Sequence, residues 1–532
     1  MGISSSQPEP QLPEGFTWPP HPQNRQELRD RYGYNPFESS GFKLEQRRRL
    51  EVVFDTFCTC SESIKFWSES NLTDFLQSTF PQEIAPILLD AIPVLHRFLL
   101  RLGSFPYQND PDKLLTLDVL RMAVILMLIY DSERAEADGP DTTLEYDTSF
   151  ADFRRVAFQS LATLDPFPSK QLQQRQRDEE DDFHLERVIH RINKEYNWQN
   201  PEDPKCIIFG PELSVSDYAS SWSNDLHRLI PIDEWRSLLR LLLVSQLYRG
   251  GINPQQFSTY PPQLEHVIDS VLGAFKENTN ATGISWEVFD RVVARSMPRF
   301  LMGWDRILGP LYSTEHLHEF PASASVSEAQ SLFRETYTPL FQREGPKSSL
   351  LDLPRLSQLD LLMLSQLQTE NASLCWSAGR EQHLNLRDLH TAMTDQQTPH
   401  QILVISGSSD KDDHVIFGAL LWSPPTAANE TPRMIVSRIF QLKPVHRSFR
   451  PLSGYCFDVK TTPPLLENDP VSIKMTIPMG EKDPDTVDLV LDETSRSGEL
   501  IMGKSPKIRE YFRIDAVEVL RVDKENKPVK FH

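Results

Sequence analysis

The spacing of apolar residues changes along this chain of 532 residues. Up to about residue 310, apolar residues recur at helical spacing, as in the stretches 116–130 and 234–248. From about Ser349 onward, short apolar runs alternate with a period of two and are separated by Pro, Gly, Asp and Ser. Helical spacing builds a core between helices, whereas alternation builds half-buried strands. The sequence therefore predicts an α+β protein with a helical region first and a β-rich region after it.

Six short runs in the last third of the chain predict strands: 401–405, 414–422, 437–442, 472–477, 486–491 and 514–522. A stretch at 351–367 precedes them and places Leu356, Leu359 and Leu362 on one face, which predicts an amphipathic helix. Strands of this length, separated by turn formers, are typical of a twisted sheet or a sandwich.

The same patterns set the expected boundaries. They are a disordered arm at 1–45, a helical domain at 46–310 with an acidic insertion near 131–185, a linker at 311–344, a β-rich domain at 345–525 and a tail at 526–532. The arm is rich in Pro, Gln, Ser and Arg and lacks an apolar face. The five adjacent acids at 178–182 indicate a solvated loop rather than a calcium cage, so we expect the insertion to act as a spacer.

Two stretches of the helical region resemble degenerate EF-hands. The stretch 277–289 has the loop length, a central Ile284 and a following Phe289, and 109–120 shows a similar pattern. Calcium binding needs a bidentate Glu at loop position twelve, which is Val288 in one stretch and Leu120 in the other. We therefore expect helix–loop–helix packing without a metal ion.

The N-terminal residues predict a lipid anchor. Met1 and Gly2, with Ser6 at the preferred position, fit the N-myristoylation pattern with Gly2 as the acceptor. No apolar run follows that would make a secretory signal. The most apolar stretch, 122–130, is about half the ~20 residues that a helical membrane span needs. We therefore expect contact with a membrane surface through the myristoyl group, not a span.

Charge and cysteine content narrow the class further. The net charge of −20 disfavours direct nucleic-acid binding, because there is no basic excess to neutralise phosphates. Five scattered cysteines indicate reduced thiols and a cytoplasmic location. Cys58 and Cys60 form a C-x-C pair without nearby partners, whereas a zinc site needs about four ligands. We expect neither a metal site nor a cofactor.

Six segments of the last third resemble, in order, the motifs of a TLDc domain. Residues 375–377, with Leu384 and Leu389, resemble its opening strand and helix. The others are 401–405 (LLVI in the family), 414–419 (xxFGA), 439–442 (xFxL), 489–493 (LxLDE) and 513–519 (FxIxxxEVWG). The usual Trp-Gly after the last motif is Leu520-Arg521 here, and residues 472–479 replace a Gly-rich strand. The resemblance covers about residues 345 to 525.

With the Gly2 motif and the EF-hand-like region, the whole layout is similar to the fungal restriction of telomere capping protein 5 family. That resemblance implies a non-enzymatic cytoplasmic protein, partly at the vacuolar membrane, that binds subunits of the vacuolar proton-pumping ATPase and modulates its assembly. It also implies a family link to a process that influences telomere capping.

Binding is favoured over catalysis. The sequence contains no G-x-S-x-G, H-E-x-x-H or Walker A motif, and 406–410 is interpreted as a hairpin loop. Glu493 and Glu518 stand where the TLDc family has acids, and we expect them to order loops or a strand end. The alternative is an oxidative-stress protection factor with a thiol-based activity, for which Cys375 and Cys456 are the available thiols.

A single myristoyl chain binds membranes only marginally, so stable recruitment needs a second signal. No cysteine lies near Gly2 for a second acyl chain, and the triplet Arg47-Arg48-Arg49 is a small basic patch at best. The sequence therefore favours a protein partner already at the membrane.

Overall fold

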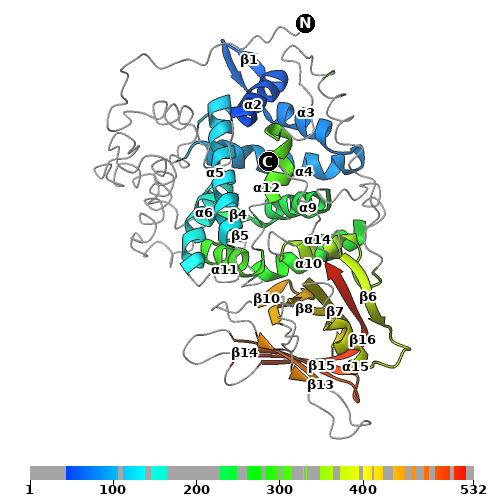
Figure 1. Ribbon diagram of the computed structural model, residues 1–532. Helices are drawn as coiled ribbons and strands as arrows, with labels where there is room; N and C mark the ends of the chain where they lie inside the picture. Colours follow the sequence, from blue (N-terminus) through cyan, green and yellow to red (C-terminus); the bar gives the residue numbers. More distant parts are fainter. Residues whose placement is uncertain are drawn as a thin grey trace.

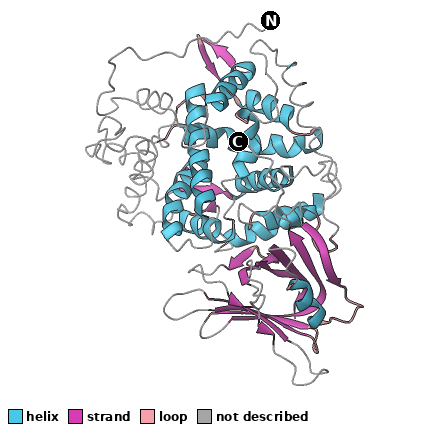
Figure 2. Cartoon of the chain, in the orientation of Figure 1, coloured by secondary structure: helices cyan, strands magenta, loops and turns pink. Residues whose placement is uncertain are grey.

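The computed structural model describes the following residues of the chain. They are 44–105, 112–137, 145–164, 228–248, 261–276, 283–297, 300, 303–313, 328, 331, 348–362, 372–394, 400–409, 413–422, 435–449, 457–458, 460–461, 472–478, 486–503 and 508–522. Most helices gather in one part and the large sheet lies in the other, as Figures 1 and 2 show. The predicted α+β class, with helices before strands, is confirmed.

The helical part is built around one long helix. Its elements are α2 (Leu44–Phe57), α3 (Glu69–Thr79), η1 (Gln82–Ile84), α4 (Ala85–Gly103), α5 (Leu117–Ala137), α6 (Glu145–Leu161), α9 (Ile232–Tyr248), α10 (Pro261–Phe275), α11 (Trp286–Ser296), α12 (Gly303–Leu308) and η6 (Gly309–Leu311). Helix α4 contacts α3, α5, α6 and α9. At Gly103 a Cβ would lie 2.0 Å from the carbonyl oxygen of Val119, so the crossing of α4 and α5 admits no side chain there.

Two boundaries differ from the sequence prediction. Helix α6 falls within the range expected to be an acidic insertion, yet Val156, Phe158 and Leu161 are buried in the core. Apolar residues at helical spacing outweigh the acidic composition on either side of them. Leu311 and Tyr312, expected to open a linker, are also buried. The acid run 178–182 and the arm before residue 44 lie outside the described residues.

The helices are joined in pairs by short β-bridges. Trp67 precedes α3 and Leu115 precedes α5, and the two form an antiparallel bridge with a 2.9 Å hydrogen bond from Trp67 N to Leu115 O. A second set links β3 (Thr163–Leu164), β4 (Arg228–Pro231) and β5 (Gly283–Ile284) in one small sheet. In it, Ile230 before α9 is opposite Ile284 before α11. Each bridge therefore ties the loop of one helix–loop–helix unit to that of another.

Strands β1 (Thr59–Ser61) and β2 (Ile64–Phe66) form a separate hairpin in the helical part (Figure 1). The remaining strands form one large antiparallel sheet. Its strands are β6 (Ala372–Ala378), β7 (His400–Ser409), β8 (His414–Trp422), β9 (Ile435–Lys443), β10 (Arg447–Phe449), β11 (Phe457–Asp458), β12 (Lys460–Thr461), β13 (Ser472–Pro478), β14 (Thr486–Asp492), β15 (Ser497–Met502) and β16 (Ile508–Val522). The order is β10-β9-β8-β7-β16-β15-β14-β13-β12, with β11 against β9 and β6 against β16. Every predicted run is a strand; β10, β11, β12 and β15 were not predicted.

Strand β16 connects the two halves of this sheet. Its first half pairs with β15 and its second half lies between β7 and β6, with a register shift between Ile514 and Ala516. Strands β13 and β9, at opposite ends of the order, contact each other, so the sheet curls around its own apolar interior. This interior is one hydrophobic core and includes Phe417 and Phe512. Helix α15 (Leu386–Met393) adds Leu389 to it.

The opposite face of the sheet packs on the helices. Ile402, Val404 and Phe440 belong to the same continuous hydrophobic core as the residues of α4 and α9. Figure 1 shows α10, α11 and α14 (Leu353–Asp360) along this boundary. Because their core is shared, the two parts of the chain form one structural unit.

Candidate functional site at the helix–sheet junction

Helix α14 lies between the helical part and the sheet. It contacts α9, α10 and β9, and its residues Leu356 and Leu359 are fully buried. The side chain of Asp352 accepts a 3.0 Å hydrogen bond from the backbone N–H of Arg355 and so caps the helix. Sequence analysis predicts a longer helix at 351–367; the described part ends at Asp360 and a turn at 361–362, and residues 363–371 lie outside it.

The carboxylate of Glu518 holds the chain just before α14. Glu518 is 1% exposed, and it accepts hydrogen bonds from Ser349 N at 2.8 Å, Ser349 Oγ at 2.6 Å and Ser348 Oγ. The Ser348 hydroxyl in turn accepts from Leu351 N at 2.8 Å. Sequence analysis expects Glu518 to order a loop, and these contacts confirm that role. Glu493 lies in the turn between β14 and β15, where its carbonyl accepts from Arg496 N.

The loop from β9 to β10 inserts a buried histidine among the helices. His446 is fully buried, and its Nε2 contacts Ser296 O at the end of α11 at 2.8 Å. Its backbone N–H donates to Ser270 O on α10, and its Nδ1 lies 3.3 Å from Gln358 Nε2 on α14. The proton is therefore on Nε2, because Nδ1 accepts from an amide. His446 thus ties three helices to the sheet, two through its ring and one through its backbone N–H.

Burial keeps this imidazole neutral. It lowers the pKa of His446 to about 4, the hydrogen bond to Ser296 opposes that change, and the nearby Arg438 adds to it. Arg438 is 2% exposed and donates to Ser448 Oγ at 2.8 Å and to Arg295 O at 3.3 Å. A cation held this close disfavours a second charge on His446.

A serine–histidine pair at the edge of the junction has the spacing of a catalytic dyad. Ser406 Oγ lies 2.9 Å from His414 Nε2, and Lys443 Nζ lies 3.4 Å from the other ring nitrogen. A lysine ammonium can only donate, so the imidazole proton is on Nε2 and points at Ser406. A general base needs that nitrogen free to accept the serine proton. Burial, Lys443 and Arg355 also lower the pKa of His414, and Asp515 opposes them.

The segment that contains Ser406 also corrects the expected hairpin loop at 406–410. Residues 406–409 continue β7, paired with β8 and β16, and residues 410–412 lie outside the described part. Ser and Gly at these positions suggested a turn, but each of Ser406 to Ser408 has a cross-strand partner in β8.

Of the two thiols considered for redox chemistry, the structure describes one. Cys375 lies exposed on β6 and is not part of a disulfide, and its thiol donates to Val519 O at 3.1 Å. Cys375 is the extra residue of a β-bulge in β6. Trp376 is opposite Val519 and Leu374 is opposite Leu520, so Cys375 has no residue opposite it in the register with β16. Such a bulge protects an edge strand from pairing with other chains. Cys456 lies outside the described residues.

The predicted acceptor of the lipid, Gly2, also lies outside the described residues, but the arginine triplet does not. Arg49 is 8% exposed and donates to Pro310 O. Arg47 is half-buried, and only Arg48 is exposed. The triplet is therefore not a basic patch facing outward, because helix α2 turns one of its arginines into the core.

The two stretches predicted to resemble EF-hands have apolar side chains at the position where calcium binding needs the bidentate acid. Leu120 is fully buried and Val288 is 4% exposed, both in the main hydrophobic core. Residues 109–111 and 277–282, which include loop positions one, three and five of 277–289, lie outside the described part. Among the described residues, no group of three or more His, Cys, Asp or Glu side chains could hold a metal ion. Within the same part, no helix is long and apolar enough to cross a bilayer.

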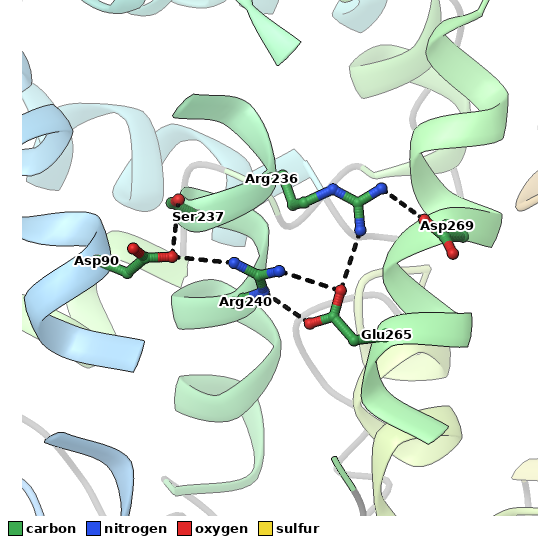
Figure 3. A network of polar contacts seen from close by, with 6 residues as sticks. All are labelled: Asp90, Arg236, Ser237, Arg240, Glu265 and Asp269. Atoms are coloured by element: carbon green, nitrogen blue, oxygen red, sulfur yellow. Dashed lines mark hydrogen bonds and ion pairs between the residues drawn. The ribbon is translucent and has the colours of Figure 1, made fainter. Parts of the chain in front are cut away.

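An ion-pair network joins α4, α9 and α10 on the helical part (Figure 3). Arg240 on α9 contacts Glu265 on α10 at 2.7 Å and Asp90 on α4 at 2.9 Å. Arg236 contacts Glu265 and Asp269. The hydrogen bonds from Arg240 hold the pKa of Glu265 below its usual value. Sequence analysis missed this network, although Arg236 and Arg240 are four residues apart and so share one helix face.

We expect the variant Arg240→Gln to lose only about 1 kcal/mol of unfolding free energy, because surface pairs gain little in water. The carboxylates that it contacts are 41% and 54% exposed. Urea denaturation should show the loss at low salt and a smaller loss in about 1 M NaCl, where the Debye length is ~3 Å. A double-mutant cycle with Glu265→Gln isolates the pair. A salt-independent loss of several kcal/mol would contradict this assignment.

No family model matches the chain. A Neurospora crassa protein is 22% identical over 387 residues, which are 71% of this chain and 59% of that protein. A Sordaria macrospora protein is 20% identical over 453 residues, 78% of this chain and 73% of that protein. An Aspergillus clavatus protein is 27% identical over 257 residues, 44% of this chain and 38% of that protein.

The chain thus spans about three fifths of the Neurospora protein and a smaller share of the Aspergillus one. All three relatives carry the name Restriction of telomere capping protein 5. The chain is similar, at low identity, to this group of fungal proteins.

Proposed function

We propose that this protein is a non-enzymatic binding protein with a TLDc-type β-rich region, which acts in the cytoplasm and partly at the vacuolar membrane. The observation that carries the proposal is that the Glu518 carboxylate has a structural role. This acid stands at a TLDc motif, and its carboxylate is occupied by three hydrogen bonds that position α14. The Ser406–His414 pair likewise has its proton on the wrong nitrogen for base catalysis.

The helical region fits a set of EF-hand-like units that have kept their packing. Paired helix–loop–helix units joined by the bridges Trp67–Leu115 and Ile230–Ile284 support this interpretation. Apolar residues at loop position twelve favour a scaffold rather than a calcium sensor. The shared core then makes the helical part a rigid support for the sheet.

The partner that we propose is the vacuolar proton-pumping ATPase, through one or more of its subunits, with modulation of pump assembly as the consequence. The family resemblance supplies this partner. Membrane physics supports the need for one: myristate at Gly2 anchors weakly, and Arg49 is turned into the core rather than toward lipid. From the name of the relatives, we also propose participation in a process that influences telomere capping.

The test compares the full-length protein with Gly2→Ala, each carrying a C-terminal tag that leaves residue 2 free. The full chain is required because removal of residues 345–532 would expose the apolar face of the helices. Vacuolar membranes are isolated, and captured proteins are identified by mass spectrometry. We expect pump subunits with both proteins, and a shift of Gly2→Ala toward the soluble fraction.

Arg48→Gln is the matched control, since Arg48 is the exposed member of the triplet. It should leave fractionation unchanged if the second signal is a protein. Strong release of Arg48→Gln would instead assign the second signal to anionic lipid. Absence of pump subunits from every capture, or a purely nuclear protein, would reject the proposed partner.

A thiol-based protection factor is the second candidate, because the thiol of Cys375 is exposed and not part of a disulfide. The double variant Cys375→Ala/Cys456→Ala should leave survival under peroxide unchanged if the protein acts only by binding. Loss of protection, with unchanged thermal unfolding, would favour the thiol mechanism. Cys60→Ala controls for removal of an exposed thiol elsewhere.

A further inference from the structure

The segment just before α14 contains an exposed serine that is bonded to a buried carboxylate. Ser349 is exposed, yet its hydroxyl donates to Glu518 Oε1 at 2.6 Å and its backbone N–H donates to the same oxygen at 2.8 Å. Glu518 itself is 1% exposed. A chemical change to the Ser349 hydroxyl can therefore be made from solvent and acts directly on a charged group inside the junction.

The bonds to Glu518 fix the place where α14 begins. The third bond comes from the Ser348 hydroxyl, which also accepts from the backbone N–H of Leu351. Leu351 is 2% exposed, and the next residue, Asp352, caps the helix. If this segment moves away, the carboxylate loses three donors, and a buried charge without donors is costly. The position of the start of α14 and the charge on Glu518 are thus coupled.

Of the two serines, Ser349 has the surroundings that suit an enzymatic modification. Ser348 is half-buried, its hydroxyl both donates and accepts, and the residue three positions after it is the apolar Leu351. The residue three positions after Ser349 is Asp352, which makes the pattern Ser-x-x-Asp. A kinase with a basic substrate cleft can bind that carboxylate by charge complementarity. Accessibility and charge therefore both favour Ser349.

We propose that Ser349 is a phosphorylation site and that its phosphate releases the start of α14 from the sheet. The serine oxygen attacks the γ-phosphorus of ATP, and a new O–P bond forms while the bond from that phosphorus to the bridging oxygen of ADP breaks. ADP leaves, and the serine proton passes to the catalytic base of the kinase. The inference does not depend on the ATPase partner proposed above.

The phosphate acts through the charge of Glu518. Phosphoserine no longer donates from Oγ, and it carries about −1.5 to −2 charges at neutral pH. A phosphate beside an acid disrupts structure through like-charge repulsion and the cost of desolvation. Residues 348–351 then leave Glu518, and the junction between helices and sheet loosens at α14.

The first experiment measures phosphate at Ser349 by mass spectrometry of the full-length protein, purified from its own cells under growth and under stress. We expect a phosphorylated fraction. Asp352→Asn should lose phosphate occupancy, because asparagine caps a helix as well as aspartate but lacks the charge. Absence of phosphate at Ser349 under every condition overturns the site. Unchanged occupancy in Asp352→Asn overturns its recognition by charge.

The second experiment compares the purified full-length protein with a form that carries phosphoserine at position 349, introduced during translation. Amide hydrogen exchange in α14 should quicken at least about tenfold, because bonds to a charged acceptor are lost. Ser349→Ala should have a smaller effect, since it keeps the backbone bond at position 349 and the bond from Ser348.

Phosphoserine at position 495 is the matched control. Ser495 Oγ also donates to a carboxylate, that of Asp492 at 2.7 Å, but in an exposed turn. Exchange in α14 should not change there. In Glu518→Gln, which removes the buried charge, phosphoserine at 349 should quicken exchange much less than in the wild type. Unchanged exchange in α14 with phosphoserine at 349, or an equal effect of phosphoserine at 495, overturns the release mechanism.

Discussion

Replacing Glu518 with alanine is expected to lower the free energy of unfolding by about 2–3 kcal/mol, because hydrogen bonds to a buried charged acceptor are among the stronger ones. The variant leaves the donors of Ser348 and Ser349 without their acceptor and creates space beside β16. Ser349 is exposed, so water can satisfy part of this loss, which keeps the estimate moderate. Urea denaturation of the full-length protein measures the change.

Glu510→Ala on the same strand is the matched control. Its carboxylate pairs with Arg447 at 3.1 Å, and both side chains are partly exposed, at 32% and 41%. A surface pair of this kind is worth about 0–1 kcal/mol. Hydrogen exchange should also quicken in α14 of the Glu518 variant and not in the control. Equal losses of unfolding free energy in the two variants would mean that the hydrogen bonds from Ser348 and Ser349 to Glu518 do not add to stability.

The hydrogen bonds of Glu518 with Ser348 and Ser349 show what the sequence could predict and what it could not. A glutamate within a family motif, in a predicted strand, predicted a structural acid. Its partners are Ser348 and Ser349, about 170 residues earlier in the chain, and no local pattern connects the two. The class of the fold follows from local periodicity, whereas the contacts of the junction depend on how distant elements pack.

The same distinction explains the misplaced elements. Helix α6 was not predicted, because acidic residues on both sides dominate the composition of the segment 131–185. Its apolar residues Val156, Phe158 and Leu161 nevertheless have helical spacing. Strands such as β10 and β12 have only three and two residues, which is too short to show an alternating pattern in the sequence. His446 was one of 14 histidines in the sequence, and its role comes only from the helices that enclose it.

A test of this buried histidine is its dependence on pH. The pKa of His446 is about 4 in the folded protein, against 6.5 for an ordinary histidine in an unfolded chain. The unfolded chain therefore binds a proton first as the pH falls. The stability that neutral His446 contributes is fully present above pH 6.5, declines between pH 6.5 and 4, and stays lost below. The difference corresponds to about 3 kcal/mol over that window.

His446→Gln removes this titration, so the stability gap between wild type and variant should narrow as the pH falls from 6.5 to 4. The groups that face His446 are Arg438 from β9, Gln358 from α14, Ser270 from α10 and the carbonyl of Ser296 at the end of α11. Arg438 is the charged one and stays protonated throughout. No carboxylate contributes to the pKa of His446, so the narrowing belongs to His446 itself.

Ser270→Ala is the matched control. It removes the hydrogen bond from Ser270 Oγ to Leu442 O, close to His446, without removing a titratable group. Its stability deficit should be about the same at pH 4 and pH 7. A gap for His446→Gln that stays constant across this range would mean that the imidazole titrates alike in the folded and unfolded states. The enclosure of His446 by α10, α11 and α14 would then be looser than the structure describes. If the gap narrows as expected, acid weakens the junction between helices and sheet through this one buried side chain.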